Sequence, residues 1–340
     1  MRALRCAIVG LGRIGSILED DPLREKPCTH AGAIAALSGC ALSGGADTDA
    51  ERRILFARRW KCPAVYEDAR LMLRDLKPDI LCVATHPDSH LRYVKLAADF
   101  GVPVAVCEKP LAGALADARK IAALHRSGKI KVITNHERRY SADYILARRR
   151  VAEERYGKLL SVGARLYFGK TRSLISQLIH DGTHLVDSIA FLAGGYPEKP
   201  VVHGDLGSKK GTAFIISRIR GTGVPVVIES GAERDHLVFE IDLSFSEGRI
   251  RIGNGLYEEY ASKKSPYYEG FRSLVITREK TFTKTGYFLS MMADAAACAR
   301  QSGRLPVSGA PDGLAALGFI IALSRGELLS PARKKRAEKT

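Results

Sequence analysis

The 340-residue sequence lacks any uninterrupted apolar run near the roughly 18 residues that a membrane-spanning helix requires. It also lacks a secretory signal pattern, because Met1–Arg5 leads directly into a short apolar segment with no small-residue cleavage site. We therefore expect a cytoplasmic protein that has no membrane partner.

Cysteine pairs with metal-binding spacing are missing as well. The 7 cysteines never form a C-x-x-C motif, which zinc sites and redox motifs commonly use. Cys6, Cys82 and Cys107 lie within apolar runs, where a reduced thiol behaves as a small hydrophobic side chain. The sequence therefore predicts buried, reduced thiols and no metal site.

The basic residues are not interleaved with aromatic ones. The net charge is +16, but the positive side chains form short, separate clusters, among them 52–53, 58–59, 148–150 and 333–336. RNA-binding modules combine basic with aromatic side chains, so we expect no nucleic-acid partner. Two explanations of the charge stay open. We favour solvated helix faces, and the alternative is an anionic substrate or cofactor.

The sequence does contain a regular alternation of apolar strands and helical segments. Strands are predicted at Leu4–Val9, Ala41–Ala46, Ile80–Ala84, Val104–Cys107 and Lys131–Thr134, and helices at Asp49–Arg59, Asp88–Asp99 and Leu115–Ser127. The strands are apolar throughout, as expected when helices cover both faces of a parallel sheet. Residues 1–136 are therefore predicted to form an α/β domain with a doubly wound parallel sheet.

After residue 136 short strands follow one another without helices between them. The predicted elements are helices at Ala142–Glu154, Asp181–Leu192, Phe288–Arg300 and Gly313–Ser324, and strands at Leu160–Phe168, Ala213–Ile219, Val224–Glu229, Leu237–Phe245 and Arg249–Ile252. Gly-rich turns between the strands indicate antiparallel pairing. We expect an α+β domain over 137–330 with an open, mainly antiparallel sheet, and a basic tail over 331–340.

A G-x-G-x-x-G motif occupies residues 10–15, directly after the first predicted strand. Its glycines allow a tight turn, a close approach of the backbone to a pyrophosphate, and close packing of helix on strand. The motif alone is weak evidence, but the strand before it and the alternation after it predict a dinucleotide-binding Rossmann domain. The expected cofactor-binding residues of this turn are Gly10, Gly12, Arg13, Ile14 and Gly15.

An acidic residue at the end of the second strand would bind the hydroxyl groups of the adenosine ribose. Asp47 has this place, although it lies further from the glycines than the usual ~20 residues. We attribute the delay to an insertion over Glu19–Pro27. An acid here favours NAD over NADP because it would repel a 2′-phosphate, although Arg52 and Arg53 nearby weaken this preference. Asp47 has an alternative role as the cap of the helix that starts near Asp49.

Four motifs, in order and in spacing, resemble the Gfo/Idh/MocA oxidoreductases, a family that includes glucose–fructose oxidoreductase and inositol dehydrogenase. They are the glycine motif, Ala84–His90, Glu108-Lys109-Pro110 and Asp181–Asp187, and the segment Asn135–Tyr140 is similar as well. The resemblance covers roughly residues 4–324. It implies hydride transfer between a nicotinamide cofactor and the hydroxyl or carbonyl carbon of a sugar, cyclitol or nucleotide sugar.

The resemblance implies that Lys109 and His184 are catalytic. Lys109 follows a predicted strand, and ligands of open α/β sheets bind at the carboxyl ends of strands. In the family this lysine binds the reacting hydroxyl and helps to move its proton, often beside a cis Lys-Pro bond. His184 matches the family's proton acceptor. The family's aspartate four residues earlier is His180 here, and an acid follows as Asp181, which leaves the substrate class and the catalytic competence open.

The remaining site residues are also implied by the resemblance. Thr85, His86, His90 and Glu108 are expected near the cofactor, and Lys109, Arg139, Tyr140, Arg165, His180 and Asp181 near the substrate. The cofactor is expected to be NAD, with NADP possible. The substrate would bind between the domains, and copies of the chain would associate through the C-terminal sheet. The alternative function is that of a regulatory pseudoenzyme of the same fold that binds NAD(P).

Overall fold

The computed structural model describes residues 2–167, 172–280, 282 and 284–326. The helices are α1 His30–Ala36, α2 Ala50–Trp60, α3 Ala69–Leu76, α4 His90–Asp99, α5 Leu115–Arg126, α6 Ala142–Ala152, α7 Leu174–Gln177, α8 Thr183–Ala193, α9 Tyr287–Arg300 and α10 Ala310–Gly326. Among the described residues, no helix is long and apolar enough to cross a membrane. The expected tail at 331–340 lies outside the described residues.

The strands fall into two sheets. They are β1 Leu4–Val9, β2 Cys40–Ala46, β3 Val65–Tyr66, β4 Ile80–Val83, β5 Val104–Cys107, β6 Lys131–Thr134, β7 Leu159–Tyr167, β8 Pro197–His203, β9 Thr212–Ile219, β10 Pro225–Gly231, β11 Val238–Phe245, β12 Gly248–Gly253, β13 Leu256–Lys264 and β14 Arg272–Glu279. Strands β1 to β6 form one sheet, and β7 to β14 form the other.

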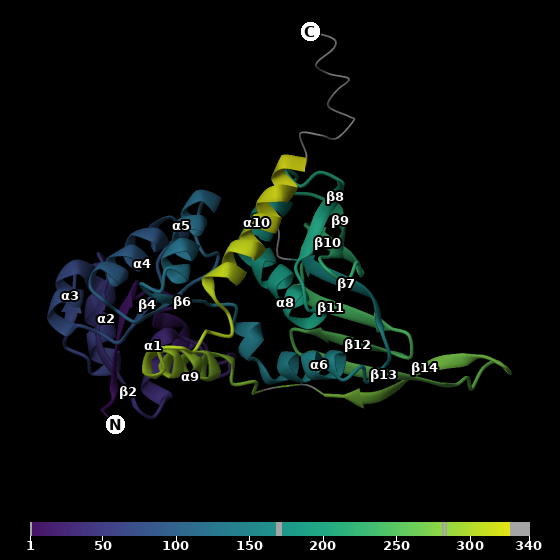
Figure 1. Ribbon diagram of the computed structural model, residues 1–340, viewed down its shortest axis with the longest axis horizontal. Coiled ribbons are helices and arrows are strands. Elements are labelled where there is room, and N and C mark those ends of the chain that lie inside the picture. The colour runs from purple at the N-terminus through teal and green to yellow at the C-terminus, as the bar shows by residue number, and fades with distance from the viewer. Residues whose placement is uncertain (1, 168–171, 281, 283, 327–340) are drawn as a thin grey trace, which may run out of the picture. The chain divides into compact units, whose positions relative to one another are not determined.

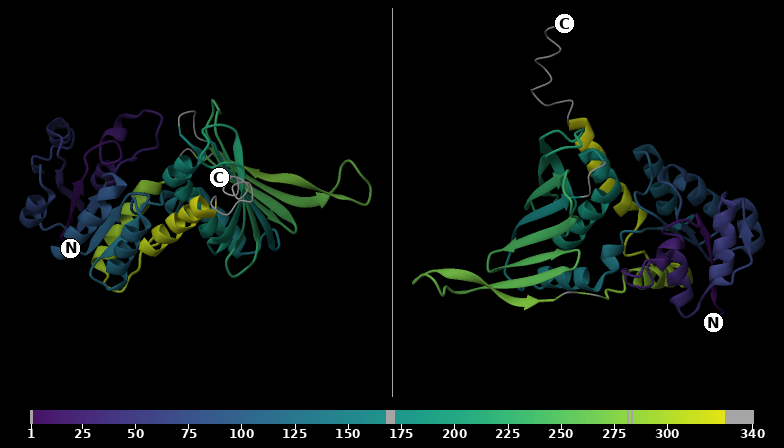
Figure 2. Two further views of the ribbon diagram at one scale, coloured as in Figure 1. Left: turned by 90° about the horizontal axis from the view of Figure 1, so that it is seen from above. Right: turned by 180° about the vertical axis from the view of Figure 1, so that it is seen from behind.

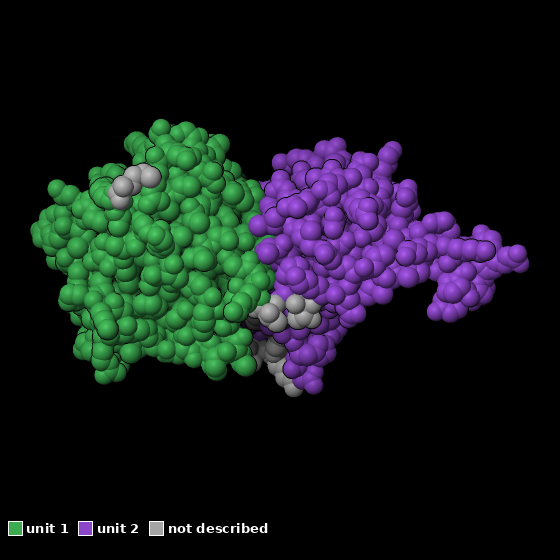
Figure 3. All heavy atoms as spheres, turned by 90° about the horizontal axis from the view of Figure 1, so that it is seen from below, with its two compact units in different colours: residues 1–141, 284–314 green, residues 142–283, 315–340 purple. Residues whose placement is uncertain are grey.

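The chain divides into two compact units, which are coloured separately in Figure 3. Unit 1 comprises residues 1–141 and 284–314, and unit 2 comprises residues 142–283 and 315–340. Unit 1 therefore includes α9 and the start of α10, which lie far beyond the boundary expected at residue 136. One reason is the hydrogen bond of 3.0 Å from the Tyr140 hydroxyl to Asp294, which ties α9 to the segment after β6.

Unit 1 is built on a six-stranded parallel sheet with the order β3-β2-β1-β4-β5-β6 (Figure 1). The helices α1, α2 and α9 share one core with β1, in which Ile34, Phe56 and Met291 are buried. The helices α3, α4 and α5 contact one another in turn. This is the predicted doubly wound fold. Its strand order reverses between β1 and β4, where such sheets bind ligands.

Unit 2 is built on an eight-stranded sheet with the order β14-β13-β12-β11-β7-β10-β9-β8. Only β7 and β10 run parallel, and the other neighbours are antiparallel, as predicted. Alternate residues of β11, such as Ile241 and Leu243, face a core that also contains Ile189 of α8 and Ile320 of α10. Figure 2 shows these helices along the sheet.

Candidate active site

The turn after β1 is shaped by its glycines. Gly10 has a φ angle of +89°, and a Cβ there would lie 2.5 Å from the carbonyl oxygen of Ala84. A Cβ on Gly15 would collide with the carbonyl oxygen of Gly10. At Gly12 the nearest atom to an added Cβ is Nη1 of Arg52, at 3.5 Å. The turn therefore needs its outer two glycines for packing, whereas Gly12 leaves the space that a pyrophosphate requires.

The chain after this motif makes one helical turn and then a loop. The Ser16 amide donates to Gly12 O at 3.0 Å, which is a bond of the helical kind. The carbonyl of Ile14 then accepts from the amide of His30 at 3.1 Å, whereas in a continuous helix it would accept from the amide four residues later. The residues between Ile14 and His30 therefore form a loop that precedes α1. The expected insertion, Glu19–Pro27, lies in this loop and accounts for the late position of Asp47.

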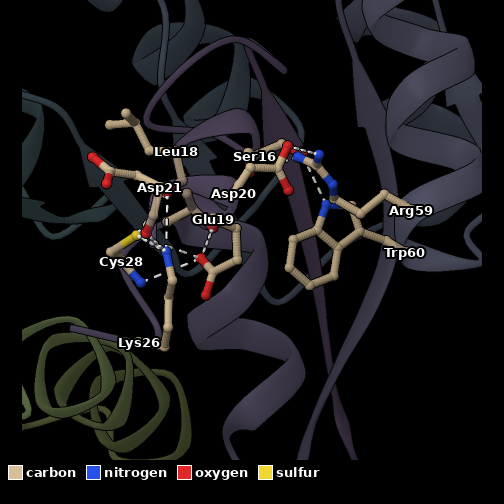
Figure 4. Close-up of polar contacts among 10 residues, drawn as sticks. Ser16, Leu18, Glu19, Asp20, Asp21, Lys26, Cys28, Arg59 and Trp60 are labelled. Atoms are coloured by element: carbon tan, nitrogen blue, oxygen red, sulfur yellow. Dashed lines mark hydrogen bonds and ion pairs between the residues drawn. The ribbon is translucent and has the colours of Figure 1, made fainter. Parts of the chain in front are cut away.

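Polar contacts hold the loop against the rest of unit 1 (Figure 4). Lys26 Nζ donates to the carbonyl oxygen of Asp21 at 2.6 Å. Trp60 Nε1 of α2 donates to Ser16 Oγ at 2.8 Å, and Arg59 forms an ion pair with Asp20. The loop is therefore fastened both within itself and to α2.

Asp47 lies at the end of β2 and faces the glycine turn. Its Oδ2 accepts from the amide of Leu11 at 2.8 Å, and its Oδ1 accepts from the amide of Asp49 at 3.0 Å. The cap of α2 is Asp49, whose side chain accepts from the first amides of that helix. The alternative role of Asp47 as this cap is therefore wrong. Arg52 Nη1 is 3.7 Å from Asp47 Oδ2, so a cation stands beside the acid.

The segment after β4 is held by His90. The ring is fully buried, with Nε2 at 3.0 Å from Thr85 O and Nδ1 at 3.3 Å from Leu111 O. Burial lowers the pKa of His90 and so favours its neutral form. Ser89 Oγ donates to Thr85 Oγ1 at 2.7 Å, and His86 is exposed. His90 thus joins two loops, and its predicted role near the cofactor would be indirect.

Glu108 and Lys109 follow β5 at the carboxyl end of the parallel sheet. Glu108 is buried, and its Oε1 lies 2.8 Å from His30 Nε2 and accepts from Asn135 Nδ2 at 2.6 Å. Lys109 is partly exposed, and the Lys109-Pro110 bond is cis. Glu108 is therefore engaged within the protein, whereas Lys109 stands at the edge where parallel sheets bind their ligands.

His184 lies near the start of α8 in unit 2 and is 8% exposed. The chain before it forms a π turn over Leu178–Gly182, a feature that is frequent at functional sites. The helix predicted from Asp181 therefore begins at Thr183, and the residues just before it lie in the π turn. His180 is exposed, and Asp181 Oδ2 lies 3.9 Å from Nη1 of Arg172.

Three predicted substrate contacts have protein partners. Arg139 Nη2 donates to Asp312 at 2.9 Å, and the buried Tyr140 bonds to Asp294. Arg165 is on β7 and lies 3.5 Å from Glu229 and 3.8 Å from Glu240. These contacts give each side chain a structural role, and their part in substrate binding stays a prediction.

Sequence reasoning missed His30. Its imidazole contacts the carboxylate of Glu108, a residue 78 positions away, so no local spacing relates the two. The sequence does contain one indication of this site, namely Thr29. Thr29 caps α1 by accepting a hydrogen bond from the amide of Gly32 at 3.0 Å. A capping threonine after a polar insertion marks the place where the helix resumes, and His30 is its first residue.

A parallel sheet with an open glycine turn at its switch point defines a dinucleotide-binding domain. Residues 4–136 match the model of an oxidoreductase family with an NAD-binding Rossmann fold, GFO_IDH_MocA. The resemblance found in the motifs is confirmed over this segment, which contains three of the four motifs.

Curated relatives match parts of the chain. D-apiose dehydrogenase of Paraburkholderia graminis is 38% identical over 93 residues, which are 27% of this chain and 24% of that protein. Inositol 2-dehydrogenase of Paracoccus denitrificans is 34% identical over 90 residues, 26% of each chain. Such matches span from 24% to 58% of the curated relatives' lengths.

The fold of both units also occurs in solved structures. An oxidoreductase from Agrobacterium radiobacter, solved with NAD+, L-tartaric acid and magnesium, has a TM-score of 0.71. The likeness covers 95% of this chain and 96% of that one at 18% sequence identity. At this identity the likeness shows the fold alone.

Proposed function

We propose that this oxidoreductase is a dehydrogenase that transfers a hydride between NAD(H) and a hydroxyl-bearing carbon of a sugar, cyclitol or nucleotide sugar. The observation that carries the proposal is the place of Lys109. It follows β5, at the carboxyl end of the sheet whose switch point carries the glycine turn. The matched family uses a lysine there, as the motif resemblance implies.

Each residue has a distinct part in this proposal. The open side of Gly12 and the carboxylate of Asp47 fit the pyrophosphate and the adenosine ribose of a dinucleotide. The bound nicotinamide supplies the carbon that accepts or returns the hydride. Lys109 binds the substrate hydroxyl oxygen, and His184 accepts its proton during oxidation.

The substrate class rests on the motif resemblance and on the names of two relatives, a D-apiose and an inositol 2-dehydrogenase. The test is a screen of D-apiose, myo-inositol, sugar acids and nucleotide sugars with NAD and with NADP, read by the absorbance of the reduced nicotinamide. We expect turnover with a polyhydroxy compound. A chain that binds NADH but turns over none of these compounds would instead support a regulatory NAD(P)-binding role.

The proposed roles of Lys109 and His184 have a separate test. Lys109→Met and His184→Ala should each lower kcat by ~10²–10⁴, because each removes a group that handles the proton. The double variant should lose less than the product of the two single losses if both groups serve one transfer. Matched controls are Lys120→Met on α5 and His203→Ala on β8, both exposed residues that should leave turnover unchanged. Independent, fully multiplicative losses would contradict a shared proton transfer.

The choice of cofactor depends on the balance between Asp47 and Arg52. The acid would repel a 2′-phosphate, and the neighbouring guanidinium would attract it. We expect NAD to be preferred because Asp47 is bonded directly to the turn. Asp47→Asn should shift the ratio of NADPH to NADH affinity upward by roughly tenfold, and Arg52→Ala should shift it downward. A wild-type chain that bound NADPH far more tightly than NADH would overturn the preference.

A further inference from the structure

Three buried side chains of unit 1 meet next to Lys109. His30 Nε2 lies 2.8 Å from Glu108 Oε1, and Asn135 Nδ2 donates to the same oxygen at 2.6 Å. His30 begins α1, Glu108 follows β5 and Asn135 follows β6, so one carboxylate oxygen joins three elements. The imidazole also meets Phe288 of α9 edge-on, with the ring centroids 5.5 Å apart. This packing fixes the ring against the carboxylate.

His30 and Glu108 have the spacing of an ion pair, and their surroundings favour opposite charges on them. Burial by itself would lower the pKa of His30, but Cys82 and Glu108 raise it to about 10. Burial by itself would raise the pKa of Glu108, but His30, Asn135 and Lys109 lower it. These shifts favour a protonated imidazole beside an ionised carboxylate, which is a pair with no net charge.

The neutrality of this pair matters for the residue that follows Glu108. Lys109 is close enough to lower the pKa of Glu108, so the two charges act on each other. A neighbouring carboxylate without a compensating charge favours the ammonium form of a lysine. A lysine that takes part in proton transfer must be able to exchange its proton, and an uncompensated Glu108 would oppose this.

We propose that His30 is a positioning residue whose imidazolium neutralises Glu108 and thereby keeps the amine of Lys109 available for proton transfer. The inference rests on the proposed function and gives that reaction a residue that the motifs do not contain. His30 acts through Glu108 and does not touch the substrate. It also links the helix of the glycine turn to the loop that carries Lys109.

Other charged groups surround the pair and stay constant in the tests. Glu137, in the turn after β6, interacts electrostatically with Glu108 and Lys109, and also with Arg138 and with Arg24 of the inserted loop. The charge of Glu108 also acts on His90 of α4, whose pKa it raises. Burial raises the pKa of Glu137, so this carboxyl is less ready to compensate a positive charge. The variants below change only His30 and Glu108.

The charge of His30 can be measured without any substrate. In the full chain labelled with ¹⁵N-histidine, NMR should show His30 as an imidazolium at pH 7 and up to about pH 10. The signal is assigned by its loss in His30→Gln. His90 and His125, whose pKa values are lowered by burial, serve as neutral controls in the same spectra. A neutral His30 at pH 7 would overturn the proposal whatever the activity of the enzyme.

The second measurement is the pH profile of kcat/KM in four forms of the enzyme. His30→Gln keeps a hydrogen-bond donor but removes the positive charge, while Asn135 and Lys109 still favour the ionised form of Glu108. The pH of half-maximal kcat/KM should therefore rise by ~1 unit. Glu108→Gln should move it little, because it removes the carboxylate itself and burial then favours the neutral form of His30. The double variant removes both charges and should restore the wild-type profile despite its lower stability.

The outcomes separate the two proposals. A merely structural role of His30 would lower activity in the single and double variants alike, with no shift and no rescue of the pH profile, and would overturn the inference. If His30→Gln fails to fold, the signal is assigned instead by its loss in the double variant, and the NMR result then decides the charge of His30. If NMR shows the imidazolium in the wild type but the enzyme turns over no compound, the proposed function is wrong. The proposed role of His30 in proton transfer is then wrong as well, although the ion pair with Glu108 is confirmed.

Discussion

Each unit buries a glutamate, in unit 1 just after a strand and in unit 2 within one, and the two carboxylates have different neighbours. Glu108 of unit 1 is 7% exposed and is held by one imidazole and one amide from other elements. Glu259 of unit 2 is 2% exposed. It accepts hydrogen bonds from the hydroxyls of Tyr156 at 2.6 Å and Tyr257 at 2.9 Å, and Arg150 lies 3.4 Å away.

The difference shows that burial alone does not mark a functional carboxylate. Glu108 follows a strand at the edge where parallel sheets bind ligands, and Lys109 comes next. Glu259 lies within β13, between neighbouring antiparallel strands, and its partners are phenols and arginines. Glu108 can therefore influence the charge near Lys109, whereas Glu259 stabilises the sheet of unit 2. The two should therefore respond differently to the same substitution.

The largest change in stability is expected for Glu259→Gln. The substitution exchanges the charged acceptor of two buried phenols for a neutral amide and removes one counter-charge of Arg150, which costs about 3 kcal/mol in total. For a unit of this size that corresponds to a Tm lower by about 10 °C, measurable by calorimetry. The exposed Glu279→Gln on β14 is the matched control and should change Tm little. NADH affinity should be unchanged in both variants. A loss of NADH binding in Glu259→Gln would contradict the purely structural role of Glu259.

The same carboxylate makes the stability depend on pH. Burial alone would raise the pKa of Glu259, but Tyr156, Tyr257 and Arg150 lower it below the ordinary value. A depressed folded-state pKa contributes stability above the unfolded-state pKa, near ~4.3, and this contribution is lost as pH falls through the folded-state pKa. Urea unfolding between about pH 6 and pH 3 should therefore weaken the wild type more steeply than Glu259→Gln. Parallel curves would show that the carboxylate has no preferential stabilisation.

Most of the fold of unit 1 could be predicted from the sequence because its strands are apolar throughout. Strands such as Leu4–Val9 and Val104–Cys107 have the predicted bounds. The two-residue β3 was missed because it is too short to form a pattern. At the edge of the other sheet, β14 was missed because most of its residues are exposed and show no apolar alternation. The assignment of α9 to unit 1 also has no local signal, since it depends on packing against distant strands.

The candidate site was predictable only where the chemistry is local. Gly10, Gly12 and Asp47 were found because the turn and the end of β2 have sequence signatures, and the structure joins Asp47 to that turn. His30 was missed because its partner is distant in the chain. The π turn over Leu178–Gly182 was missed because it has no sequence signature, and the helix predicted from Asp181 begins at Thr183 instead. Association through the C-terminal sheet stays a prediction.

A smaller effect, confined to unit 1, is expected from its glycine turn. Gly12→Val should lower NADH affinity at least ~100-fold, about 2.7 kcal/mol, because the side chain would fill the space beside the turn. Tm should change little, since an added Cβ meets only Arg52. Gly15→Ala is the contrasting variant and should lower Tm, because its methyl group meets the backbone of Gly10. Calorimetry and NADH fluorescence titration measure the two effects, and a folded Gly12→Val with unchanged NADH affinity would rule out this cofactor turn.

The smallest effect is expected at a buried polar group of unit 2 that contrasts with both glutamates. Gln177, at the end of α7, is fully buried, and neither atom of its amide has a hydrogen-bond partner among the described residues. Burying an amide without partners costs free energy, because the group gives up its bonds to water. The carboxylates of Glu108 and Glu259 have compensating partners, whereas this amide has none there.

Gln177→Met should therefore stabilise the chain, in contrast to substitution of either glutamate. Methionine has a similar length and no amide to satisfy, and removing an unsatisfied polar group recovers about 1 kcal/mol, or a Tm higher by about 3 °C. Gln301→Met is the matched control, because Gln301 is exposed and should respond within about 0.5 kcal/mol. If Gln177→Met lowers Tm instead, the amide has a partner such as a buried water, and the contrast with the glutamates disappears. If Gln177→Met raises Tm but also raises KM for the substrate found in the screen, the amide of Gln177 forms hydrogen bonds to substrate hydroxyls. The native glutamine would then lower the stability of the protein but improve substrate binding.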